Sequence, residues 1–169
     1  PQLRLDVGTQ ALVSHDSLRP SLSLLPAAAY QQLLVVSPRS PDTVARLVRE
    51  AGGDPANVGH LPLSATDHEY DGPLWTAESL DPSDLTGLSM RCSRALEPLE
   101  EGHGWMLFDS FNTLLVYADA RRVVRFLNHL TRQAREAEVR GVFTVARDAM
   151  DDQTYATLQR VVDTEIDLR

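Results

Sequence analysis

The sequence contains no lysine, because all 16 of its basic residues are arginine. A domain of this size normally carries on the order of ten lysines. With 24 acidic residues the net charge is −8. Excess acid with arginine in place of lysine is typical of proteins from extreme halophiles, where concentrated salt screens the self-repulsion of a charged surface. A genome rich in G and C, which favours arginine codons, is the alternative explanation.

Disulfides, membrane spans and a secretion signal are also missing. Cys92 is the single cysteine, so no internal disulfide can form, which fits a reducing cytoplasm. No apolar run approaches the ~20 residues of a membrane helix, and the N-terminus has no signal-peptide pattern. At 169 residues and 43% hydrophobic composition, the chain is predicted to be one cytoplasmic domain, residues 1–169, with a core of its own.

A glycine-rich phosphate-binding loop is absent as well. Such a loop needs glycines, a lysine and a hydroxyl to hold the phosphates. Its expected place follows the first predicted strand and covers residues 14–21, which contain no glycine. Pro20 removes an N–H donor, Asp16 repels phosphate, and Arg19 supplies charge without the loop geometry. We therefore predict no cofactor and no tight, Mg-dependent ATP binding.

Apolar patterns of strand and helix type alternate along the chain. Strands are predicted at residues 11–14, 32–37, 58–63, 105–109, 141–145 and 164–168. Helices are predicted at 41–51, 82–99, 120–137 and 152–162, opened by Ser40, by Asp81-Pro82, by Asp119 and by Asp151 or Asp152. Residues 64–81 are predicted to be an exposed, mobile loop insertion. The alternation predicts a three-layer α/β fold, with a mostly parallel sheet and helices on both faces.

The most informative segment runs from Trp105 to Leu115. Its apolar strand ends abruptly at Asp109 and Ser110, and a helix-like pattern begins at Phe111. A parallel strand of this kind delivers a carboxylate to the carboxyl edge of the sheet, where nucleotide-binding folds hold Mg²⁺. Because the phosphate-binding loop is missing, we favour the simpler interpretation that Asp109 hydrogen-bonds backbone N–H groups of the following turn.

The other reactive side chains form no recognisable catalytic or metal site. Among the histidines, His68 lies in the predicted loop with Asp67, Glu69 and Asp71, where a solvated acidic loop is favoured over a metal centre. Cys92 recurs with leucines at helical spacing, which places it in the core. No serine sits in a G-x-S-x-G elbow. We predict no catalytic residue and no metal ligand.

A cluster of arginines raises the question of nucleic-acid binding. They share one predicted helix and its end: Arg121, Arg122, Arg125, Arg132, Arg135 and Arg140. Glutamates intervene, the chain is acidic overall, and high salt removes most of the counterion-release contribution. A solvated helix face is favoured, and nucleic acid stays a weaker alternative.

Several segments resemble the KaiC-like branch of RecA-type ATPases, in particular the degenerate KaiC/RecA-like proteins of haloarchaea. The resemblance rests on Gln32–Ser37 with Ser40-Pro41-Asp42, on Asp109-Ser110 with Leu114–Asp119, on Arg125-Phe126-Leu127 and on Gly141–Leu168. It covers residues 30–50 and 80–168 and depends on order and spacing more than on any one motif.

The resemblance implies a RecA/KaiC-like fold that has lost most of its ATPase elements. Asp109 matches the Walker B aspartate, but the position of the catalytic glutamate pair reads Ser37-Pro38-Arg39-Ser40. With the phosphate loop also missing, the resemblance implies a pseudo-ATPase whose vestigial nucleotide positions are Asp109, Ser110 and Arg19. RecA-type domains pack side by side, which implies self-association or docking onto an active relative.

These observations predict a non-catalytic domain that acts in regulation or signalling through protein–protein contacts. A nucleic-acid-associated transcriptional regulator and a weakly nucleotide-binding ATPase relative are the alternatives. Mobility shifts and ATP titration distinguish them.

Overall fold

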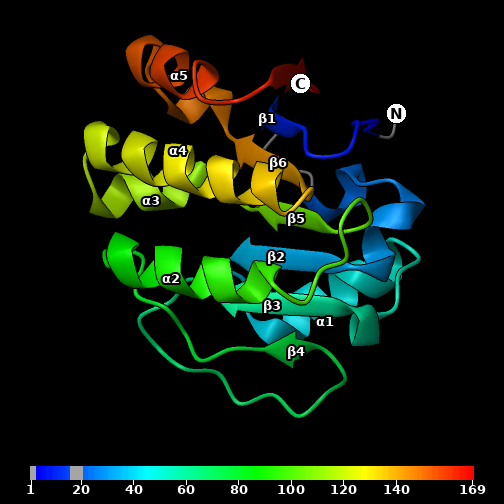
Figure 1. Ribbon diagram of the computed structural model, residues 1–169. Helices are drawn as coiled ribbons and strands as arrows, with labels where there is room; N and C mark the ends of the chain where they lie inside the picture. The colour runs from blue at the N-terminus through cyan, green and yellow to red at the C-terminus, as the bar shows by residue number, and fades with distance from the viewer. Residues whose placement is uncertain (1–2, 16–20) are drawn as a thin grey trace.

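The computed structural model describes residues 3–15 and 21–169 and shows an α/β fold (Figure 1). Its sheet has seven strands, all parallel, in the order β4-β3-β2-β5-β6-β1-β7. The strands are β1 (Gln10–Ser14), β2 (Leu33–Ser37), β3 (Val58–Pro62), β4 (Trp75–Thr76), β5 (Trp105–Phe108), β6 (Arg140–Val145) and β7 (Thr164–Asp167). The predicted α/β class and parallel sheet are confirmed.

Helices cover both faces of this sheet, as predicted. They are α1 (Pro41–Glu50), α2 (Leu85–Leu96), α3 (Phe111–Tyr117), α4 (Ala120–Glu136) and α5 (Asp152–Gln159). In Figure 1, α2, α3 and α4 lie in front of the sheet and α1 lies behind it. Short 3-10 helices at Ser21–Leu24 and Ala27–Gln31 pack with α1, and two more occur at Pro55–Asn57 and Arg147–Ala149.

Two apolar clusters, one on each face, make up the core. Because side chains alternate along a strand, Leu34 and Val36 of β2 join the cluster under α2, α3 and α4, whereas Leu33 and Val35 join the cluster under α1. Strands β2 and β5 are buried on both faces, which explains their continuous apolar sequences. Cys92 is fully buried in the first cluster, as its helical spacing predicts.

Side-chain caps fix where most helices begin. Ser40 accepts the Thr43 N–H at 3.3 Å, Asp119 caps α4, and Asp151 caps α5, all as predicted. The prediction for α2 is wrong by one turn, because Asp84 caps it by accepting the Gly87 N–H at 2.9 Å. Asp81 bonds the Ser83 N–H instead and forms a turn before the helix.

The segment 64–81 is more ordered than an exposed loop. Trp75 and Thr76 pair with β3 as the edge strand β4, and Leu74 is 3% exposed in the cluster under α1. Asp67 accepts the Ser79 N–H at 3.1 Å, which ties the two ends of the segment together. A two-residue strand is too short to produce an alternating pattern, so the sequence does not reveal it.

Candidate functional site

Asp109, the carboxylate predicted from the sequence, lies where this fold reverses its strand order. Strands β2 and β5 are neighbours, but the chain continues from β2 to β3 on one side and from β5 to β6 on the other. In open α/β sheets, ligands bind outside the carboxyl ends of the strands at such a reversal. Ser37 ends β2 and Asp109 directly follows β5, so both lie at this position.

Asp109 is buried and receives three side-chain donors from distant segments. Its Oδ1 accepts the Ser21 hydroxyl at 2.8 Å. Its Oδ2 accepts the Ser37 hydroxyl at 3.2 Å and the Arg39 Nε–H at 3.3 Å. The expectation of bonds to the next turn's backbone is therefore replaced by a polar cluster of Ser21, Ser37, Arg39 and Asp109, which we call the Asp109 cluster.

The Asp109 cluster is poorly suited to a metal ion. A carboxylate offers about four hydrogen-bonding positions, and protein donors fill three of them. Arg39 places its positive charge where a bound cation would have to lie, and Mg²⁺ needs oxygen ligands. Asp109 acts here as the counterion of Arg39, at 3.3 Å, which is a different arrangement from a carboxylate that binds Mg²⁺.

Hydroxyl groups extend this cluster along the carboxyl edge. The Ser21 hydroxyl also lies 3.4 Å from Thr144 Oγ1, and Thr144 donates to the Phe108 carbonyl at 3.2 Å. At the end of β1, Ser14 donates to the Tyr155 hydroxyl at 3.4 Å. Burial raises the pKa of the Tyr155 phenol above its usual range.

Ser110 and Arg19 are the other two predicted nucleotide positions. Ser110 is the N-cap residue of α3, and its hydroxyl lies 3.5 Å from Asn112 Oδ1 and not against Asp109. Asn112 in turn holds the Ala146 N–H at 2.8 Å, which fastens α3 to the end of β6. Arg19 lies outside the described residues.

Sequence reasoning missed the partners of Asp109. Ser37 and Arg39 stand where the resemblance implies a glutamate pair, and the sequence shows only that no carboxylate is present there. Ser21 is 88 residues from Asp109 along the chain. No local pattern indicates such a pairing, although the sequence Ser-Pro-Arg after a buried strand does place hydroxyl and guanidinium groups at the correct edge.

Metal and thiol chemistry have no geometric support in the part of the chain that the structure covers. Within residues 3–15 and 21–169, no three His, Cys, Asp or Glu side chains lie together as a metal-binding group. Burial raises the pKa of the Cys92 thiol to about 12, so it is protonated and unreactive at neutral pH.

The predicted arginine face is divided among several environments. Arg135 pairs with Asp163 at 3.1 Å, and Arg140 donates to two backbone carbonyls. Arg121 lines a depression between α4 and α5, whereas Arg122 lines another between α4 and α2. Arg125 lines the same depression as Arg122, so two of the six arginines share one site, whereas Arg135 and Arg140 are held by other groups.

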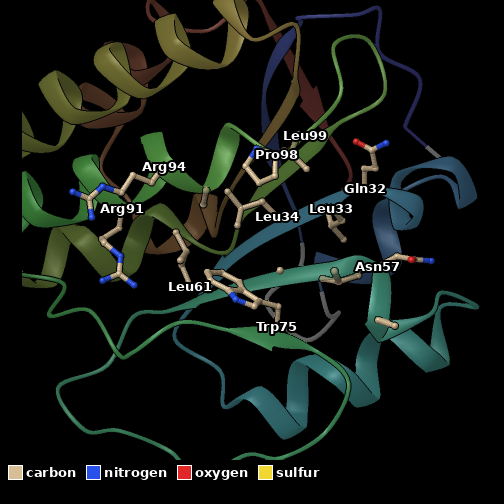
Figure 2. A pocket seen from close by; sticks show the side chains of 14 residues that line it. Gln32, Leu33, Leu34, Asn57, Leu61, Trp75, Arg91, Arg94, Pro98 and Leu99 are labelled. Carbon is tan, nitrogen blue, oxygen red and sulfur yellow. The ribbon is translucent and has the colours of Figure 1, made fainter.

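An apolar groove lies between α2 and the β2–β3–β4 side of the sheet (Figure 2). Its volume is about 660 Å³. Leu34 and Leu61 are part of its lining, with Trp75 of β4 beside them and Arg91 and Arg94 on α2. Nothing in the sequence patterns joins these residues, because the wall at Trp75 exists only through the pairing of β4 with β3.

Comparisons with known proteins support the fold and give no activity. A solved structure from Pyrococcus horikoshii OT3, titled only as a structural study, is similar with a TM-score of 0.59 and 12% identity over 98% of this chain and 84% of that one. No curated protein matches. No helix in the described part of the chain is long and apolar enough to span a bilayer. A family model matches residues 8–168, and the chain therefore belongs to that family of unknown function, DUF7504.

Proposed function

We propose that this chain is a non-catalytic, RecA/KaiC-like cytoplasmic domain that acts in regulation or signalling through protein–protein contacts. The observation that carries the proposal is the closed state of the Asp109 cluster. The carboxylate at the ligand-binding position of the fold is occupied by Arg39 and two serine hydroxyls of its own chain.

The Asp109 cluster favours a structural role over nucleotide chemistry. A Mg²⁺–nucleotide at Asp109 would have to displace Arg39 and leave its guanidinium beside the metal. Two cations competing for one carboxylate repel each other strongly in a partly buried site. The absence of lysine removes the residue type that usually reaches the β- and γ-phosphates.

The distribution of arginines gives little support to the nucleic-acid alternative. Of the six arginines on and after α4, Arg135 is ion-paired and Arg140 is held by backbone carbonyls. A duplex-binding surface needs several cations in one array to neutralise successive phosphates.

Calorimetric titration of the whole chain with ATP and Mg²⁺ at millimolar concentration tests the non-catalytic part. We expect no saturable heat from the wild type or from Asp109→Asn. Saturable heat that disappears in Asp109→Asn would show that Asp109 serves a nucleotide, and it would overturn the proposal.

Two experiments test the proposed protein–protein contacts. They are light scattering after gel filtration, over a range of protein concentrations, and affinity capture of a partner. We expect either self-association or a stoichiometric partner that remains bound through washing. A strict monomer that captures no partner would contradict this part of the proposal.

A further inference from the structure

We propose that the groove between α2 and strands β2–β4 binds a small, planar molecule that has an apolar body and one anionic group. Its volume of about 660 Å³ falls within the roughly 300–1,000 Å³ usual for small-molecule sites. Such sites combine mainly apolar walls with a few polar groups that fix the orientation of the ligand. The groove has this composition, and the inference stands apart from the Asp109 cluster and from the proposed protein contacts.

Trp75 provides a flat aromatic platform in the groove. It pairs with Gly59 across β3 and β4, and a Cβ atom placed on Gly59 would lie 3.3 Å from Trp75 Cε3. The indole therefore lies close against the bare backbone of Gly59. Even so, 57% of the Trp75 surface remains exposed. An indole that is packed against backbone and still largely exposed offers aromatic surface on which a planar ligand can stack.

The floor of the groove is apolar. Leu34 of β2 is 2% exposed and Leu61 of β3 is buried completely, and both line the cavity beside Trp75. Ala95 and Leu99, on and just after α2, add apolar wall. Ala95, Leu99 and Trp75 are partly exposed, so an apolar molecule that lies against them releases water from both surfaces of the contact, which favours binding.

Two arginines on α2 supply the charge. Arg91 and Arg94 are three residues apart, which brings their side chains to the same side of the helix. Neither forms an ion pair with any carboxylate in the described ranges, in contrast to Arg39 and Arg135. Two guanidinium groups that pair with no described carboxylate, at the margin of an apolar groove, favour a carboxylate, sulfonate or phosphate group on the ligand.

The polar groups lie at opposite ends of the apolar floor. Figure 2 shows Arg91 and Arg94 at one end and Gln32 and Asn57 at the other, with Leu34, Leu61 and Trp75 between them. This arrangement fits a short molecule with one anionic end better than a polymer that passes through the groove. The net charge of −8 also disfavours nucleic acid as the occupant.

Anilinonaphthalene sulfonate is a suitable probe, because it joins a flat naphthalene ring to an anionic sulfonate and its emission rises in an apolar site. We expect saturable 1:1 binding to the folded chain, with energy transfer from tryptophan. Trp75 is the exposed tryptophan and Trp105 is 5% exposed. The variant Trp75→Phe leaves Trp105 as the remaining energy-transfer donor and so shows how much of the transfer comes from each. The neutral analogue N-phenylnaphthylamine, which lacks the anion, should bind at least tenfold more weakly.

Charge reversal on α2 tests the role of the arginines. Arg94→Glu and Arg91→Glu should each weaken binding of the sulfonate by about tenfold or more and leave the neutral analogue unchanged. Arg49→Glu is the matched control, because Arg49 occupies the last turn of α1 as Arg94 does in α2 and lies outside the groove. Equal losses in Arg49→Glu and Arg94→Glu would overturn the proposal.

Three other results would also overturn it. They are equal affinity for the neutral and anionic probes, binding that does not saturate at one site, and binding that Trp75→Ala leaves unchanged. Circular dichroism and the denaturation midpoint show whether each variant is folded, and affinities are compared only among folded variants.

Discussion

The Asp109 cluster lies at the carboxyl end of β2 and the α2 groove includes the first residues of the same strand, and the two sites differ in how their charges are satisfied. In the cluster, Arg39 and two serine hydroxyls all meet Asp109 within the chain. In the groove, Arg91 and Arg94 meet no carboxylate of the described residues, and Trp75 is largely exposed. The position where this fold class usually binds a ligand is therefore the one whose charges are already paired within the chain.

The physical reason is the cost of leaving polar groups unpaired. A buried carboxylate without partners costs several kcal/mol, and the donors Ser21, Ser37 and Arg39 remove this cost at Asp109. An exposed guanidinium carries no such cost, because water solvates it until a ligand arrives. Closed polar clusters therefore indicate stability, and open arginines beside apolar surface indicate binding.

The largest loss of stability is expected from a substitution that disrupts the Asp109 cluster. Asp109→Ala removes the acceptor of Ser21, Ser37 and Arg39 and should lower the free energy of unfolding by about 3 kcal/mol, toward the low end for buried pairs because Arg39 is 38% exposed. Urea denaturation measures the loss. Glu101→Ala, an exposed control, should change little. A loss below about 1 kcal/mol would mean that the cluster does not stabilise the fold.

A second effect is pH-dependent and arises beside the groove. His60 of β3 is buried opposite Thr76, and burial lowers its pKa to about 4, with the Ser37 backbone opposing the shift. Because the folded pKa lies below the unfolded value, stability is full above about pH 6.5 and falls as pH decreases toward 4. The loss between pH 7 and pH 5 should be about 2 kcal/mol.

Urea denaturation at several pH values measures this loss. His60→Gln should remove the step, whereas His129→Gln, which removes an exposed histidine, should retain it. An identical pH profile for the wild type and His60→Gln would show that other groups cause the acid sensitivity.

A smaller effect tests whether the cluster acts as a unit. Ser37→Ala removes one donor to Asp109 and should cost about 1 kcal/mol in the wild type. In the Asp109→Ala background the same substitution should cost less, because the bond to Asp109 is already gone and the Arg39 N–H bond to the Ser37 hydroxyl, at 3.1 Å, is all that it then removes. Denaturation of the four proteins in this cycle measures the coupling, and additive losses would indicate that Ser37 and Asp109 act independently.

The smallest expected effect on stability comes from a substitution that tests the contact between Trp75 and Gly59 in the groove. Gly59→Ala places a Cβ 3.3 Å from Trp75 Cε3, so the exposed indole should shift outward at a cost below about 1 kcal/mol. Trp75 emission should move to longer wavelength while that of Trp105 stays fixed, as Trp75→Phe in the same background verifies. Unchanged emission would mean that the indole does not rest on Gly59.

Much of the fold follows from short-range patterns. Ser40, Asp119 and Asp151 identify helix starts because a cap bonds an N–H only two or three residues away. The apolar strand before Asp109 and the helical spacing around Cys92 predict burial that the structure confirms. Such patterns cannot reveal a strand of two residues. They also cannot decide whether Asp81 or Asp84 caps the second helix.

By itself, the sequence determined the α/β class, the parallel sheet, the central strand that ends at Asp109, and the absence of a phosphate-binding loop. Each depends on residue type and local periodicity. The tertiary structure decided that Asp109 is closed by Ser21, Ser37 and Arg39, and that Trp75 meets Gly59 beside the arginines of α2. These contacts join segments far apart in the chain, and only the packing of the whole sheet determines which polar groups find partners and which stay open to a ligand.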